Sequence, residues 1–179
     1  MYLRDLYLYF SQFVSATALN KNVIAQRGGT STPISESRAL YGDNNRFSEI
    51  NDYIFIGDSD NVLERLRNSD VLLFVDSDRI FFLPNMDGGI SLSLGVTVAE
   101  HYASPNSDVM SELELQDRCL DRLRVIVGQV AHDSEYGCPL KLHLENTPEL
   151  RALSAKQLNG LIGYTAFFTI SCAEYGTVA

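Results

Sequence analysis

The segment ISLSLGVTVAEHY, residues 90–102, constrains the fold most strongly because apolar residues alternate in it with polar or small ones. Successive side chains of an extended strand point to opposite faces of a sheet. One face of this strand carries only aliphatic side chains, namely Ile90, Leu92, Leu94, Val96 and Val98. The other face carries Ser91, Ser93, Gly95 and Thr97. We expect a long strand that covers a core with one face and meets water or a polar surface with the other.

Three further segments have the composition of strands. NDYIFIG (51–57) is short and apolar, and LKLHLEN (140–146) alternates. GLIGYTAFFTISC (160–172) is long, and one of its faces carries Tyr164, Ala166, Phe168, Ile170 and Cys172. Because short turns join strands that are neighbours in the chain, we expect a mostly antiparallel sheet.

Helical periodicity marks two long segments, residues 2–18 and a helix within residues 104–134, in which apolar residues recur every three or four positions. The predicted buried stripe of the second helix is Leu113, Leu120, Leu123, Val127 and Val130. Shorter helical stretches are expected in residues 58–70 and 147–158. We predict an α+β fold with two long helices on one face of the sheet, in a single domain spanning residues 1–179.

Composition limits the function. Hydrophobic residues make up 45% of the 179 residues, which is enough for a core. The formal net charge of −9 argues against nucleic-acid binding, which needs a basic face. Arg4 and Asp5 interrupt the apolar N-terminal segment, and no small-residue cleavage site follows it. We therefore expect a chain made in the cytoplasm, with no membrane and no nucleic acid among its partners.

No residue pattern indicates a cofactor or a metal site. Cys119, Cys138 and Cys172 are odd in number and distant in sequence, so we expect reduced thiols. The three histidines form no HxH or HExxH pattern, and no GxSxG nucleophile motif is present. The sequence therefore predicts no catalytic residue, no metal ligand and no bound cofactor.

The stretch VLLFVDSDRIFFLP, residues 71–84, places Asp76 and Asp78 between two apolar runs. An apolar strand followed by Asp-x-Asp resembles the motif of GT-A type glycosyltransferases, whose carboxylates hold a divalent ion. The resemblance ends at these three residues, because no substantial nucleotide-binding half precedes them. Aspartate and serine also favour turns, so we interpret Asp76-Ser77-Asp78 as the turn of a hairpin. A metal-dependent enzyme that uses Asp76 and Asp78 is kept as an alternative.

The predicted hairpin and the last strand are apolar on both faces. Two long helices can cover only one face of the sheet, so the other must be closed by another chain or by an arm of this one. That second face is the candidate interface, and its members are Leu72, Phe74, Phe81 and Phe167.

Residues 20–50 differ from the rest of the chain. They are rich in Asn, Ser, Thr, Gly and Arg and contain Gly28-Gly29 and Pro33. Polar loops of this length within a compact domain are usually functional or disordered. We expect a long loop or arm that meets a partner, with Arg27 and Arg38 as further candidate interface residues.

The order of elements is similar to that of the tail-terminator and head-to-tail neck-ring (connector) proteins of tailed bacteriophages. The shared order is an N-terminal helix, antiparallel strands with a protruding loop or hairpin, a long helix and two C-terminal strands. The ending QLNGLIGYTAFFTIS, a small-residue turn that enters a long final strand, resembles the close of such subunits. The long polar segment of residues 20–50 departs from the family pattern and leaves the position in the ring open.

The resemblance implies a non-enzymatic structural subunit of the virion. Such a protein forms a homo-oligomeric ring, commonly hexameric or dodecameric, and docks to portal, connector or tail proteins without a cofactor. Two other functions stay open beside it. One is a small cellular adaptor or immunity-type binding module, which would be a stable monomer. The other is the metal-dependent enzyme described above.

Overall fold

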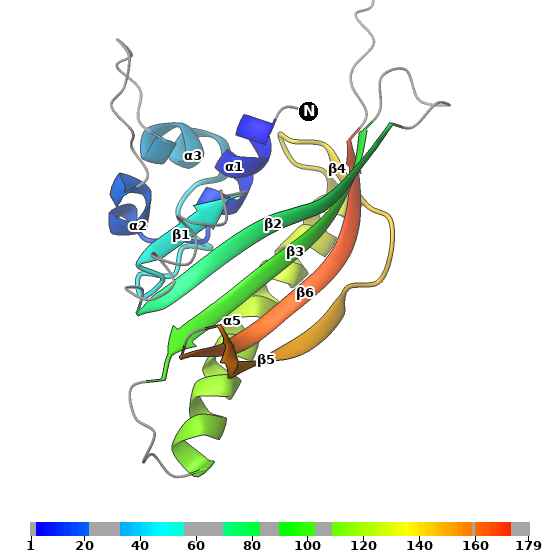
Figure 1. Cartoon of the computed structure of the whole chain (residues 1–179). Helices are drawn as coiled ribbons and strands as arrows, with labels where there is room; N and C mark the ends of the chain where they lie inside the picture. The colour runs from blue at the N-terminus through cyan, green and yellow to red at the C-terminus, as the bar shows by residue number, and fades with distance from the viewer. Residues whose placement is uncertain are drawn as a thin grey trace, which may run out of the picture.

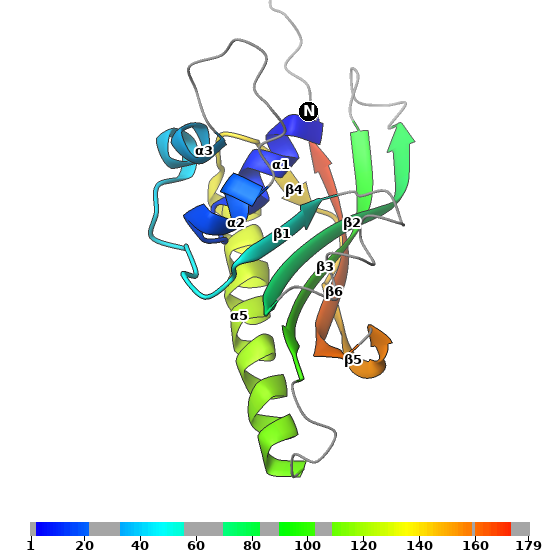
Figure 2. The ribbon, with the colours of Figure 1, turned by 60° about the vertical axis from the view of Figure 1, so that its left-hand side comes forward.

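The computed structural model describes residues 3–21, 33–55, 70–82, 90–102, 109–158 and 160–172. Its elements follow the order α1, α2, α3, β1, β2, β3, α5, β4, β5 and β6. The helices lie on one side of a twisted sheet, and α5 runs along the back of the strands in Figure 1. Figure 2 shows the same two layers from the side. The α+β class predicted from the sequence is confirmed.

The sheet has six strands in the order β1-β2-β3-β6-β4, and β5 also pairs with β6. Their bounds are β1 Asp52–Phe55, β2 Val71–Phe82, β3 Ile90–His101, β4 Leu142–Leu144, β5 Glu149–Leu158 and β6 Leu161–Cys172. The β1–β2 pair is parallel, and the other pairs are antiparallel. The alternating segment of residues 90–102 contains the central strand β3, which pairs with β2 on one side and β6 on the other.

The helices are α1 Leu3–Ser11, α2 Ala16–Lys21, α3 Pro33–Tyr41 and α5 Val109–Tyr136. The prediction of two long helices was therefore wrong, since only α5 is long among the described helices. The N-terminal apolar stripe continues through both α1 and α2, because both helices face the same core. The periodicity of the apolar residues therefore gave no sign that the helix is divided into α1 and α2.

Ser15 causes that break. Its hydroxyl accepts a hydrogen bond from the backbone N–H of Ala18 at 3.2 Å, which makes Ser15 the N-cap of α2. Its own N–H donates to the carbonyl of Ile50 at 3.0 Å. The guanidinium of Arg46 donates to the carbonyls of Ser11, at 3.2 Å, and Val14, which the end of α1 leaves without helical partners.

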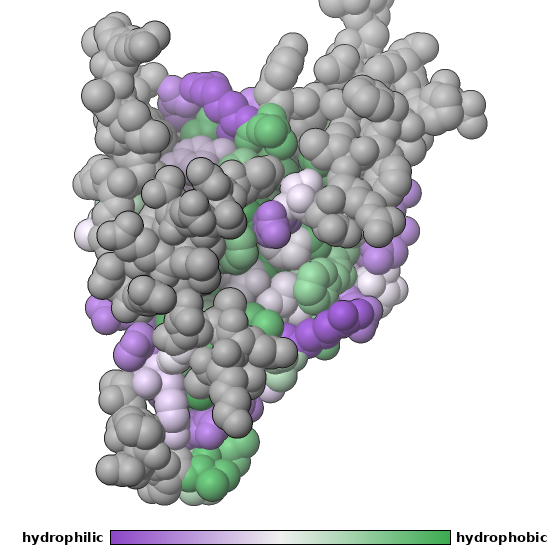
Figure 3. Space-filling model, viewed as in Figure 1, coloured by the Kyte–Doolittle hydropathy of each residue, from purple (hydrophilic) through white to green (hydrophobic). Residues whose placement is uncertain are grey.

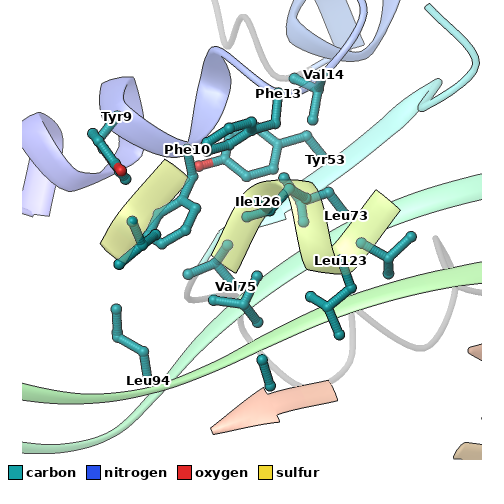
Figure 4. Close-up of a cluster of buried hydrophobic side chains, with 14 of the residues drawn as sticks. Tyr9, Phe10, Phe13, Val14, Tyr53, Leu73, Val75, Leu94, Leu123 and Ile126 are labelled. Carbon is teal, nitrogen blue, oxygen red and sulfur yellow. The ribbon is translucent and has the colours of Figure 1, made fainter. Parts of the chain in front are cut away.

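The core fills the space between the helices and the inner face of the sheet. Figure 4 shows side chains of α1, of the turn that follows it, of α5 and of β2 meeting there, including Phe10, Phe13, Ile126 and Leu73. All four are fully buried. The inner row predicted for the last strand is confirmed, since Ala166, Phe168, Ile170 and Cys172 are buried and Tyr164 packs against the same cluster.

The buried stripe of α5 differs from the predicted one. The buried apolar residues are Leu115, Cys119, Leu123, Ile126 and Val130, spaced by three or four positions. Leu123 and Val130 were predicted correctly, but Leu113 is 46% exposed. The first turns of α5 extend past the strands, so an apolar residue there has no sheet beneath it.

The interpretation of Asp76-Ser77-Asp78 as a hairpin turn was wrong. These residues lie within the single strand β2, which pairs with β3 from Val71 to Phe82. The register shifts between Ser77 and Arg79, so the strand accommodates Asp78 as a β-bulge. The Asp76 carboxylate accepts a hydrogen bond from the N–H of Ser77 at 2.8 Å, which satisfies a backbone donor locally. Continuous pairing with the long β3 outweighs the local preference for a turn.

Two further expectations were overturned. Residues 149–158 form the strand β5 rather than a helical link, because pairing with β6 overrides the helix propensity of ELRALSAKQL. Residues 33–50, which were expected to belong to a long loop or arm, are also part of the packed fold. They include α3, which packs near α1, and Ile50, which is fully buried. Arg27 and the proposed helix of residues 58–70, apart from Asp70, lie outside the described residues.

Candidate interaction surface on the outer face of the sheet

The outer face of the sheet is built from three rows of residues that the strand register places side by side. One row is Leu72, Ala99, Gly163 and Leu153, the next is Phe74, Thr97, Thr165 and Arg151, and the third is Asp76, Gly95, Phe167 and Glu149. The two middle strands contribute mostly small residues, whereas β2 and β5 contribute larger ones. The face is therefore a trough with raised sides.

The trough contains a hollow of about 190 Å³ between β2 and β5. Its lining consists of Phe74, Asp76, Gly95, Thr97, Leu153, Thr165 and Phe167. Figure 3 looks onto this face and shows pale and green surface between purple side chains. The hollow is smaller than the roughly 300–1,000 Å³ typical of pockets for drug-sized ligands. It suits a side chain better than a cofactor.

The floor of the hollow satisfies its own polar groups. The hydroxyls of Thr97 and Thr165 lie 2.7 Å apart and share a hydrogen bond, and both residues are buried. Because each hydroxyl has a partner, the methyl groups and the glycine backbone leave a floor with little demand for a polar ligand.

Phe167 is the main exposed apolar group of this surface, with 41% of its area accessible. Its ring lies against Gly95: a Cβ added to that glycine would stand 3.4 Å from the ring. The guanidinium of Arg151 lies 5.1 Å from the ring centroid, in cation–π range. Its Nε also donates to Glu149 at 2.9 Å, and this hydrogen bond raises the pKa of Arg151. A charged rim thus borders an apolar patch.

The candidate interface residues predicted from the sequence do not all lie on the same surface. Phe74 and Phe167 both line the hollow. Leu72 is fully buried in a small outer cluster with Ile54, Ala99 and Leu161, to which no described helix contributes. Leu72 therefore belongs to the packing of the chain itself. The side chain of Phe81 lies outside the described part of the structure.

Arg38 lies away from this face, on α3. It is exposed, and its Nε contacts the Asp43 carboxylate at 2.8 Å. Hydrogen bonds from Arg46 and Arg38 together lower the pKa of Asp43. Arg38 therefore belongs to a surface ion-pair cluster rather than to the sheet surface.

Other polar clusters of the described chain serve the fold. The hydroxyl of Tyr9 donates to the buried carboxylate of Asp133 at 2.8 Å, and Gln129 donates to the same group at 2.7 Å. Within the described residues, no group of three or more His, Cys, Asp or Glu side chains is arranged to hold a metal ion.

A second depression, of about 440 Å³, is lined by residues 144–148 and is more open than the hollow on the outer face.

Several residues of the hollow were not identified from the sequence as part of a site. Gly95 and Thr97 were visible as the small outer row of their strand, but their neighbours across the sheet depend on long-range pairing. Arg151 and Leu153 were missed because their segment was predicted to be helical. The signal that could have indicated a strand there is the spacing of Glu149 and Arg151. Residues two positions apart lie on the same face of a strand, so these opposite charges can pair.

Comparisons of the chain with protein-family models, with curated proteins and with solved structures give no match. Among the described helices, none combines the length and the apolar composition that crossing a membrane requires.

Proposed function

We propose that the chain is a non-enzymatic structural subunit that assembles with copies of itself through the outer face of its sheet. In this proposal the assembly is a ring at the head–tail neck or the tail end of a tailed bacteriophage, docked to portal, connector or tail proteins. The observation that carries the proposal is the trough on the outer face, where Phe74 and Phe167 surround a hollow that no described helix covers.

The free energy available from covering Phe167 is too small for one strong contact and favours an assembly in which the contact is repeated. Full burial of a Phe side chain is worth roughly 1.5–3 kcal/mol. About two fifths of Phe167 is exposed, so covering it adds on the order of 1 kcal/mol per copy. A stable interface buries about 1,000 Å² or more in total, so the contact must extend over the rest of the face. A closed ring repeats such a contact at every subunit boundary.

The order of elements is the second support. An N-terminal helix, strands that include the antiparallel pair β2–β3, a long helix and C-terminal strands follow each other in the order that resembles the neck-ring and tail-terminator proteins. Four features distinguish this chain from the simplest form of that order. The N-terminal helix is divided, α3 follows it, β1 pairs with β2 in parallel, and β5 adds an edge strand.

Light scattering coupled to size exclusion tests the proposal. We expect the parent to be larger than one chain of 19.9 kDa, and negative-stain microscopy to show closed rings of uniform diameter. Phe167→Asp should dissociate the assembly, because it places a carboxylate in the apolar contact. Val125→Asp is the matched control, since Val125 is exposed on α5, on the other side of the sheet. A parent that stays a monodisperse monomer at high concentration would contradict the proposal and favour the adaptor alternative.

A further inference from the structure

The N-terminal tip of α5, residues 109–114, projects from the molecule. The first buried residue of this helix is Leu115, so the six residues before it carry no buried side chain. At 1.5 Å per residue they extend the helix by about 9 Å. Figure 1 shows this end of α5 reaching beyond the strands, and green surface is visible at the lower end of the molecule in Figure 3.

The tip carries a cluster of exposed apolar side chains. Val109 is 72% exposed, Met110 is 63% exposed and Leu113 is 46% exposed. Residues three and four positions apart are neighbours on a helix, so Leu113 lies beside both of the others. Single exposed apolar residues are ordinary, but a cluster at a projecting end marks an interaction site.

The tip is held in place by the turns that follow it. Arg118 and Arg122 each place a guanidinium nitrogen 2.8 Å from the carboxylate of Glu100 on β3. Arg122 also contacts Glu49 at 3.3 Å. These ion pairs fasten α5 to the end of the central strand. A tip that is already positioned loses little conformational freedom on binding, which favours its use as an anchor.

The hollow on the outer face fits this tip in size. Its volume is about 190 Å³, and an apolar cavity of about 150 Å³ holds a benzene molecule. One Met or Leu side chain is of that scale. Methionine suits a hollow of irregular shape because its unbranched chain adapts to its surroundings.

Charged groups border both surfaces and restrict how they can meet. Glu112 and Glu114 stand beside Met110 and Leu113 on the tip, and Glu114 is exposed. Arg151 stands at the rim of the hollow beside Phe167, where its charge is paired with that of Glu149. Asp76 lines the opposite side of the hollow, so the orientation that brings the glutamates to the Arg151–Glu149 side avoids a contact with Asp76 and is favoured over the reverse.

We propose that the tip of α5 in one copy inserts into the outer-face hollow of the next copy, with Met110 as the anchor. This inference rests on the proposed function and names the element that occupies its surface. Tip and hollow are different parts of the chain, so the contact is head-to-tail. A head-to-tail contact generates a closed ring when its rotation closes.

Mixing two variants tests the inference. Met110→Asp has a damaged tip and an intact hollow, whereas Phe167→Asp has an intact tip and a damaged hollow. Each alone is expected to be monomeric by light scattering, with a dissociation constant raised at least tenfold. Mixed together, they retain one good contact and are expected to form a 1:1 heterodimer that grows no further. Val125→Asp, on the same helix, should assemble like the parent, and circular dichroism should show all variants folded.

The outcomes separate the two claims. If the parent is an oligomer and Phe167→Asp is monomeric while Met110→Asp still assembles, the outer face is the interface but the tip does not fill it, and this inference fails alone. If the mixture forms no heterodimer although each variant is folded, the head-to-tail contact is refuted. If the parent is a monomer at every concentration, the proposed function fails as well.

Discussion

Among the described glycines, Gly163 of β6 is the one at which an added methyl group should disturb the sheet most. It pairs with Ala99 of β3. A Cβ built on Gly163 would lie 2.0 Å from the carbonyl oxygen of Val98 and 2.7 Å from the Cα of Ala99. Both are backbone atoms of the central strand, so no side-chain rotation relieves the clash. Glycine in a strand often marks such a close approach of another backbone.

Gly163→Ala must therefore push β6 away from β3 or lose their hydrogen bonds. Overpacking typically costs 1–3 kcal/mol, and each ladder bond lost adds about 1 kcal/mol, so we expect a loss of about 3 kcal/mol or more. For a chain of this length that corresponds to a fall of about 6–12 °C in Tm.

Differential scanning calorimetry or urea unfolding measures this effect, and Gly128→Ala is the matched control. Gly128 lies within α5, where an added Cβ has nothing within 4 Å. The same chemical change there should stabilise the chain by about 0.5–1 kcal/mol, because alanine favours a helix over glycine. A Gly163→Ala variant as stable as the parent would refute the close approach of the two strands.

Three further predictions concern buried and charged groups. Tyr9→Phe removes a donor from the buried carboxylate of Asp133, so the free energy of unfolding in urea should fall by about 1.5–3 kcal/mol, and an unchanged value would contradict the contact. Burial raises the pKa of Cys119 to about 12 and that of Cys172 to about 11; neither thiol should react with Ellman's reagent near neutral pH in the folded chain, and labelling at the rate of the unfolded chain would count against this packing. Burial by itself would raise the pKa of Glu100, but hydrogen bonds from its two arginine partners outweigh burial and lower it. This carboxylate therefore stabilises the fold above its unfolded pKa, and that contribution is lost as the pH falls through its folded pKa. In Glu100→Gln the free energy of unfolding should fall less steeply on acidification than in the parent. An equal slope in both would show that the Glu100 ion pairs do not contribute to the acid sensitivity of the fold.

The strands with clean alternation could be predicted because the pattern itself decides which face is buried. On β3, the side chains of Leu92, Leu94, Val96 and Val98 lie against the core as expected, and so does the inner row of β6. The apolar character of the outer face was also visible, since Phe74 and Phe167 fall opposite the inner rows.

The errors arose where long-range contacts override local preference. Asp76-Ser77-Asp78 has the composition of a turn, but the length of β3 keeps it within a strand as a bulge. The segment of β5 has helix-forming residues and becomes a strand because β6 offers an edge to pair with. Ser15 could have been recognised as a cap, but the apolar periodicity continues across it.

The hollow could not be derived from the sequence, because it depends on register. Thr97 faces Thr165 and Gly95 faces Phe167 only if β3 and β6 pair as they do, and a shift by one residue would exchange the two faces. The projecting tip of α5 depends likewise on where the strands end beneath the helix.

Oxidative footprinting of Phe167 at low and high protein concentration tests the central claim most directly. Hydroxyl radicals label exposed side chains, and mass spectrometry reports the extent at each residue. Tyr136, which is 71% exposed near the far end of α5, serves as the internal control. We expect labelling of Phe167 to fall several-fold as the protein assembles, while labelling of Tyr136 stays constant. Equal labelling of Phe167 in the free and the assembled protein would contradict a contact at the outer face of the sheet.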